Sequence, residues 1–262
     1  MIVNLADWKQ IIENADMVLV GIGEDFEQKQ FLQANEKYCS LCDRIAASHL
    51  EWAMPYVNRA FLKENTKLLE AYKALEELLT GKNYFVLTTC MDGLIRETGL
   101  KQERIVEPCG TYAKMQCIDG CENSITQTST EFLAKLDACF IQSNAGAELT
   151  ESFCEICGKP MVLNSLYAEK YDEAGYQADW EVYTKWLQGT LNRKLCILEL
   201  GSGMMFANVL RFRFEKIAGL NQKSTLIRVH KNLYQLPEEV SKRGVGIAKD
   251  AMVFMAEMPE VW

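Results

Sequence analysis

The sequence predicts an α/β fold of the Rossmann type, in which a parallel sheet carries helices on both faces. Three observations lead to this prediction. Short, mostly apolar runs typical of buried strands occur at 17–20, 84–88, 195–200 and 225–229. Helix-compatible segments separate these runs, as successive β-α-β units require. Glycine or polar residues follow each run directly, and ligands of open parallel sheets bind at that edge of the sheet.

The length of the chain predicts one large domain, or one domain plus a small module. The chain has 262 residues, of which 48% are hydrophobic and 24% are charged, as in ordinary globular proteins. A net charge of −8 argues against a nucleic-acid partner, because neutralising phosphates needs clustered Lys and Arg. The sequence has neither a polybasic membrane signal nor an apolar run of about 20 residues, so no membrane partner is expected. Without a secretory signal at its start, the chain is expected to be cytoplasmic.

The first elements follow from the spacing of apolar residues. A helix is expected at 4–14. The strand at 17–20 then enters the turn Gly21-Ile22-Gly23. Residues 25–81 are helix-compatible and almost free of glycine, and they are predicted to form a helical insertion. Pro55 interrupts this stretch once and Gly81 ends it.

The middle of the chain differs from the rest. Residues 112–162 carry several cysteines and show no long buried strand. They are therefore predicted to be an insertion rather than part of the main sheet. The remaining segments, 1–24, 82–111 and 163–262, are predicted to form the nucleotide-binding domain.

Four cysteines of that insertion have the spacing of a structural metal site. Cys117 and Cys121 are spaced C-x₃-C, and Cys154 and Cys157 are spaced C-x₂-C. Two such turns can supply four thiolates to one tetrahedral zinc ion. Disulfides are rare in the cytosol, which favours zinc over cross-links. Four buried thiols without a metal are the alternative.

Two glycine turns are candidates for holding phosphates. Gly21 and Gly23 follow the first strand, and Gly201-Ser202 follows the run at 195–200. Glycine permits a tight turn and close approach of backbone N–H groups to a pyrophosphate. A plain strand-to-helix turn would also account for the first pair of glycines. His230 ends another predicted strand and lies at the edge where ligands bind.

These pieces, in this order, resemble the sirtuin family of NAD-dependent protein deacylases. The resemblance covers most of the chain and is close in seven patches. The order and spacing of the patches are more specific than any one of them. The seven patches are MVLVGIG (17–23), YFVLTTCMDGL (84–94), IVEPCGTYAKMQC (105–117), CEICGKPMV (154–162), LELGSGM (198–204), LIRVHKN (226–232) and GVGIAKDAMVFM (244–255).

The resemblance implies what the protein would bind. It implies NAD or an ADP-ribose-containing ligand, a structural zinc ion, and an acylated or other protein as substrate. It also implies that 244–255 is the C-terminal helix. The cofactor-binding positions that it indicates are Gly21, Ile22, Gly23, Thr89, Cys90, Asp92, Gly201, Ser202 and His230.

The sequence departs from the family where the family does its chemistry. Cys109 aligns with the family's catalytic histidine. In the motif that follows the second strand, Cys90 aligns with the asparagine and Thr89 with the preceding glutamine, while the aspartate is kept as Asp92. His230 aligns with the asparagine that holds the ribose. Cys109, Cys90 and Asp92 are therefore the candidate catalytic residues. A free thiol has a pKa near 8.5, so Cys109 is a poor general base.

Three functions follow from these departures. The favoured one is a protein that binds NAD or ADP-ribose and whose deacylase activity is weak or lost. The second is an active deacylase or ADP-ribosyltransferase in which Cys109 or Cys90 acts covalently. The third is a non-enzymatic nucleotide-sensing module.

Overall fold

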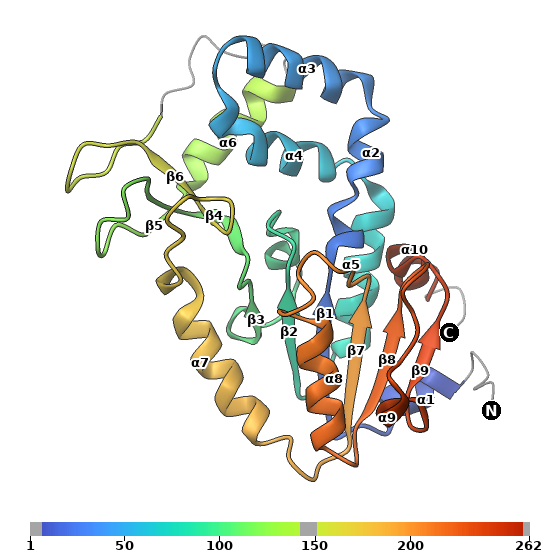
Figure 1. The fold of residues 1–262 in the computed structure, drawn as a ribbon. Helices are drawn as coiled ribbons and strands as arrows, with labels where there is room; N and C mark the ends of the chain where they lie inside the picture. Colours follow the sequence, from blue (N-terminus) through green and yellow to red (C-terminus); the bar gives the residue numbers. More distant parts are fainter. Residues whose placement is uncertain (1–6, 142–150, 259–262) are drawn as a thin grey trace.

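The computed structural model describes residues 7–141 and 151–258. Its centre is a six-stranded sheet, parallel throughout, in the order β3-β2-β1-β7-β8-β9 (Figure 1). The predicted fold class and all four predicted strands are confirmed. The strands are β1 (Met17–Ile22), β2 (Tyr84–Thr88), β3 (Ile105–Val106), β7 (Leu195–Leu200), β8 (Thr225–Val229) and β9 (Val245–Ile247).

Helices cover both faces of this sheet because its strands are apolar on both sides. Successive residues of a strand point to opposite faces. Val18 and Val20 accordingly pack with one set of helices, and Leu19 packs with the other. The first set is α1 (Asp7–Glu13), α5 (Thr66–Leu79) and α10 (Ala251–Ala256), and the second is α7 (Ala174–Gln188), α8 (Arg211–Leu220) and α9 (Glu238–Ser241).

The order of the strands places a crevice between β1 and β7. From β1 the chain proceeds to β2 and β3 on one side, and β7, β8 and β9 extend the sheet on the other. Where the direction of strand order reverses, the loops after two neighbouring strands diverge to opposite faces and leave a crevice at their carboxyl ends. The turns after β1 and β7 therefore border the place where this type of sheet binds ligands.

Most of the predicted helical insertion lies beyond the carboxyl ends of the strands (Figure 1), but its last helix, α5, packs on a face of the main sheet. Pro55 occupies the first turn of α4, where its missing N–H costs nothing, and Gly81 follows α5 with φ +73°. Helix α6 belongs to the 112–162 segment, yet Phe132 on it stacks on Trp52 at 6.2 Å. The two predicted insertions therefore share an apolar contact. These helices are α2 (Lys29–Gln33), α3 (Glu36–Ala47), α4 (Met54–Leu62) and α6 (Thr130–Ile141). Short 3₁₀ turns lie at Glu24–Glu27 and Glu51–Ala53, and two more follow β2 at Leu94–Glu97 and Gln102–Arg104.

A second sheet accounts for the rest of the middle segment. Strands β4 (Gly110–Cys117), β5 (Thr126–Gln127) and β6 (Met161–Ser165) form it in the antiparallel order β5-β4-β6. The expectation of no long buried strand there is wrong, because β4 is eight residues long and mostly buried. The strand was missed because several of its residues are polar and give no apolar run. Gln116, for example, is buried, and its side-chain oxygen accepts a hydrogen bond from Asn164 at 2.7 Å.

The two ends of the chain also differ in detail from the prediction. The helix expected at 4–14 is α1, and residues 4–6 lie outside the described part. The prediction of a single C-terminal helix at 244–255 is wrong, because residues 245–247 form strand β9, which pairs with β8. Helix α10 begins only after Asp250, whose side chain caps it by accepting the N–H of Val253 at 3.0 Å. In the described ranges no helix is long and apolar enough to cross a bilayer.

Candidate functional site

The turns that follow β1 and β7 pack directly against each other. A side chain at Gly23 would overlap the backbone of Gly201 and Ser202, so only glycine allows this approach. Gly201 has φ +62° and lies against the Cβ of Asp25. The structure thus brings together the two glycine turns that the sequence singled out.

Gly21 has a different position from the one expected of a phosphate-contacting residue. It lies inside β1, where a side chain would overlap the ring of Phe214 on α8. The N–H of Gly23 donates to the carbonyl of Leu200 at 2.8 Å, and that of Gly201 donates to Val229 at 2.8 Å. These N–H groups therefore hold the turns in place, and a phosphate must use N–H groups further along the loop.

The end of β2 joins the same cluster through buried hydrogen bonds. Thr89 is fully buried, and its N–H donates to the carbonyl of Ile22 at 2.9 Å. Cys90 is also buried, and its thiol donates to the carbonyl of Gly23 at 3.3 Å. Burial, and then the charge of Asp92, raise the pKa of Cys90 well above its ordinary value. Thr89 and Cys90 therefore connect neighbouring strand ends as neutral groups.

Cys109 stands at the position that aligns with the catalytic histidine, and it is fully buried. Burial raises the pKa of its thiol to about 12, and the carboxylates of Glu27 and Glu24 act in the same direction. At neutral pH the side chain is a neutral thiol. It can act neither as a general base nor as a thiolate nucleophile in this conformation.

Asp92 has a carboxyl whose pKa is raised to near neutrality. Burial raises the pKa of its carboxyl to about 7, against the N–H of Leu94, which donates to Oδ1 at 2.7 Å. Its other oxygen, Oδ2, is buried without a hydrogen-bond partner. Asp92 lines a cavity of about 240 Å³ together with Glu27, Lys29 and Tyr167. A buried carboxylate oxygen without a partner is unusual in a folded protein, and it marks Asp92, at the wall of this cavity, as a candidate functional residue.

His230 follows β8 and is almost buried. Its Nδ1 accepts the N–H groups of Asn232 and Leu233, each at 3.0 Å. Both partners are donors, so Nδ1 carries no proton and Nε2 does. Nε2 lies 3.9 Å from Oδ1 of Asp25. His230 therefore shapes the turn after β8 with one nitrogen and keeps the other as a donor beside the glycine turns.

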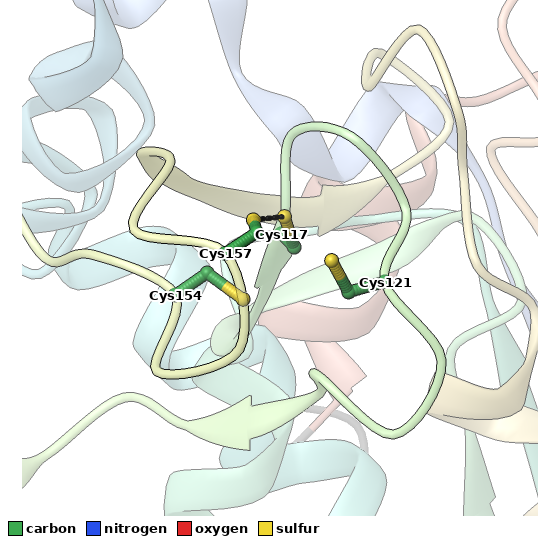
Figure 2. A group of neighbouring side chains, drawn as sticks. All are labelled: Cys117, Cys121, Cys154 and Cys157. Carbon is green, nitrogen blue, oxygen red and sulfur yellow. Dashed lines mark hydrogen bonds between the residues drawn. The ribbon is translucent and has the colours of Figure 1, made fainter.

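The four predicted metal ligands come together at the end of the second sheet (Figure 2). All four Sγ atoms lie within 4.8 Å of one another, and those of Cys117 and Cys157 are 3.5 Å apart. Sulfurs around one tetrahedral zinc lie roughly 3.8 Å apart, given Zn–S bonds of about 2.3 Å. Backbone N–H groups, of Cys121 first and then Asp119, lower the pKa of Cys117 to about 6. The quartet has the geometry to hold a metal ion.

Solved sirtuin structures resemble this chain over nearly its whole length. Sir2Tm bound to a propionylated peptide matches with a TM-score of 0.56 at 14% identity, over 98% of each chain. The chain has the sirtuin fold. A Sir2 complex with a p53 peptide and NAD⁺ also matches, with a TM-score of 0.54, the same identity and the same coverage. At this identity the sirtuin likeness establishes the fold alone.

Two curated relatives match part of the sequence, while no protein-family model does. A protein ADP-ribosyltransferase of Staphylococcus aureus is 22% identical over 183 residues, which is 69% of this chain and 58% of that protein. A probable bifunctional ADP-ribose hydrolase/ADP-ribosyltransferase of Fusarium oxysporum is 30% identical over 143 residues, 52% of this chain and 24% of that protein. The chain thus spans less than two thirds of either relative.

Sequence reasoning missed two residues at this site, Glu24 and Glu27. Glu24 accepts hydrogen bonds from the loop after β7, and Oε1 of Glu27 is buried without a partner at the wall of the cavity. The only sequence signal was an acidic segment directly after a glycine turn. Negative charge at this place is unexpected in a phosphate-binding protein, because it repels the phosphate.

Proposed function

We propose that this chain binds NAD or an ADP-ribose-containing nucleotide at the crevice between the ends of β1 and β7. Its chemistry is ADP-ribosyl transfer, and its lysine deacylation is weak or absent. The close packing of Gly23 on Gly201 and Ser202 supports the nucleotide site, because it leaves main chain rather than side chains at the crevice. The sirtuin fold and the names of the two curated relatives support the same class of ligand.

The observation that carries the proposal is the neutrality of Cys109. Sirtuin-type deacylation needs a general base at this position, and a positioned base contributes about 10²–10⁴ in rate. A buried thiol with a pKa of about 12 supplies no base at neutral pH. The rate of deacylation should therefore be lower by about 10²–10⁴, whereas a reaction that needs no base at this position should keep its rate.

Asp92 is the residue that we assign to proton transfer. Bound NAD would supply an activated ribose carbon, at which nicotinamide leaves and an acceptor atom takes its place. The acceptor must then give up a proton, and a carboxyl with a pKa of about 7 can take it. Asp92 lines the cavity in which that acceptor, or the nicotinamide amide, would lie, and its Oδ2 has no hydrogen-bond partner.

Zinc is the metal that we propose for the cysteine quartet. Four thiolates at one point, supplied by two short turns, form a closed structural site with no open position for a substrate. The ion would hold the second sheet together and take no part in the transfer.

The experiment combines binding with product detection. The parent protein is titrated calorimetrically with NAD and with ADP-ribose. Nicotinamide release is then followed with acetyl-lysine peptides and, separately, with unmodified protein acceptors. The variants are Cys109→Ala and Asp92→Asn, with Cys196→Ala as the control because Cys196 is an equally buried thiol in β7.

We expect nucleotide binding by all four proteins. We expect transfer by the parent, Cys109→Ala and Cys196→Ala, with a loss of about 10²-fold or more in Asp92→Asn. Robust deacylation by the parent that disappears in Cys109→Ala would overturn the proposal and make Cys109 catalytic. Binding without any nicotinamide release would point to a sensing module, and the absence of binding would remove the nucleotide altogether.

A further inference from the structure

The carboxylate of Glu24 sits on the backbone of the loop after β7. Its Oε2 accepts the N–H of Gly203 at 2.7 Å. Its Oε1 accepts the N–H of Met205 at 3.0 Å and that of Phe206 at 3.3 Å. Three main-chain donors in one short loop thus converge on one anion, which the protein itself supplies.

This loop is where the fold would use such donors for a ligand. It continues directly from Gly201-Ser202 at the carboxyl end of β7, beside the reversal of strand order. Converging backbone N–H groups form an anion cradle irrespective of the anion's source. A phosphate oxygen and a carboxylate oxygen accept the same hydrogen bonds, so the cradle can hold one of them at a time.

We infer that Glu24 is an internal competitor for the phosphate group of the nucleotide. It fills the cradle formed by Gly203, Met205 and Phe206 when no nucleotide is bound, and it must leave before a phosphate can enter. This inference rests on the proposed nucleotide ligand. The cradle itself is defined by hydrogen bonds that do not depend on that proposal.

The test compares ADP-ribose affinity in three variants and the parent by calorimetry. Glu24→Ala removes the competitor. Glu24→Gln keeps its size but replaces one acceptor oxygen with a donor that faces N–H groups. Glu257→Gln is the control, because Glu257 is a half-exposed carboxylate that pairs with Lys249 after α10. A population held closed lowers the apparent affinity by the open fraction, so the Glu24 variants should bind on the order of tenfold more tightly, and the control should match the parent.

A second measurement needs no nucleotide. Hydrogen exchange of the amides of residues 203–206 should be faster in Glu24→Ala than in the parent, and pyrophosphate should bind Glu24→Ala more tightly than the parent. Equal or weaker ADP-ribose affinity of folded Glu24 variants, in a parent that binds ADP-ribose, would overturn the inference. If no protein binds ADP-ribose, the proposed nucleotide fails. The hydrogen-exchange and pyrophosphate measurements then test only whether Glu24 occupies the cradle. Exchange or pyrophosphate affinity that is the same in Glu24→Ala as in the parent would count against it.

Discussion

Cys109 and Cys117 lie close together in the sequence, and their surroundings shift their thiol pKa values in opposite directions. Burial without hydrogen-bond donors raises the pKa of Cys109 to about 12. Backbone N–H groups lower the pKa of Cys117 to about 6. One thiol is therefore suited to remain neutral, and the other is suited to bind a metal as a thiolate. Residue type alone does not assign either role.

Asp92 allows this reasoning to be tested through stability. Its pKa of about 7 in the folded protein lies above the ordinary value of 3.8. Between these values the folded protein holds a proton that the unfolded chain has released. The free energy of unfolding should therefore fall as pH rises from about 4 to 7, by on the order of 1–3 kcal/mol from this group.

Asp92→Asn should remove that part of the pH dependence, since an amide does not titrate. The measurement is urea unfolding at several pH values between 4 and 8 for the variant and the parent. Asp43→Asn is the control, because Asp43 is exposed on α3. Parallel pH profiles for Asp92→Asn and the parent would show that the carboxyl titrates normally.

At the scale of elements, β7 and β8 are joined by a buried ion pair as well as by their ladder. Glu199 and Arg228 are partners in the parallel register, and both are almost fully buried. The guanidinium donates to both carboxylate oxygens, at 2.8 and 2.9 Å. Arg228 also donates to Glu215 on α8 at 2.9 Å, so the pair fixes how this helix lies on the sheet.

Glu199→Gln should lower the free energy of unfolding by about 3 kcal/mol, because it leaves a buried guanidinium without its main counter-charge. Chemical denaturation monitored by tryptophan fluorescence measures the loss. The comparison is Glu77→Gln, whose exposed partner Lys73 is 4.0 Å away and which should change stability by less than about 0.5 kcal/mol. Similar losses in the two variants would contradict the prediction.

The two glycine turns form a second junction between elements. Gly23→Ala places a methyl group against the backbone of Gly201 and Ser202, which cannot rotate away. We expect a loss of roughly 1–3 kcal/mol and weaker ADP-ribose binding.

A matched glycine substitution separates this clash from the general effect of a methyl group. Gly219 lies inside α8, and its nearest neighbour would be 4.0 Å from the added carbon. Gly219→Ala should stabilise the protein by about 0.5–1 kcal/mol, because alanine favours a helix. The two melting temperatures should move in opposite directions, and a stable Gly23→Ala protein with parental affinity would mean that the turns can separate.

At the scale of the whole molecule, the second sheet depends on little apolar packing of its own. The cluster beside the cysteine quartet consists of Met115, Cys117, Cys154 and Met161, with Cys121 at its edge. So small a core supplies little stabilisation. Zinc bound by the quartet, as we propose, would therefore supply much of the folding free energy of this part.

Removal of the metal should consequently unfold the second sheet before the main sheet. We expect that protein purified without added zinc contains about one zinc ion per chain, and that a strong chelator lowers its melting temperature. Metal analysis and titration of accessible thiols before and after chelation measure both effects. A metal content near zero, with the four thiols freely reactive in the folded protein, would refute the zinc site.

The proposed division into a nucleotide-binding domain and two insertions belongs to the same scale, and it stays a prediction. The contact between Phe132 on α6 and Trp52 beside α4 crosses the proposed border between the two insertions. Chelation also tests this border. If the contact between Phe132 and Trp52 is strong, α6 should stay folded when the second sheet unfolds, and if the contact is weak, α6 should unfold with that sheet.

The sequence by itself determined the parallel sheet, the positions of four of its strands and the cysteine quartet. These features are local, since an apolar run or a C-x₂-C pair is visible in a few consecutive residues. It did not reveal β4, whose buried polar residues are satisfied by a strand far along the chain. Only the tertiary structure decided that Cys109 is neutral, that Asp92 has an unpaired oxygen, and that Glu24 binds a loop 179 residues away. Burial and long-range hydrogen bonding set these properties, and neither is encoded in a short stretch of chain.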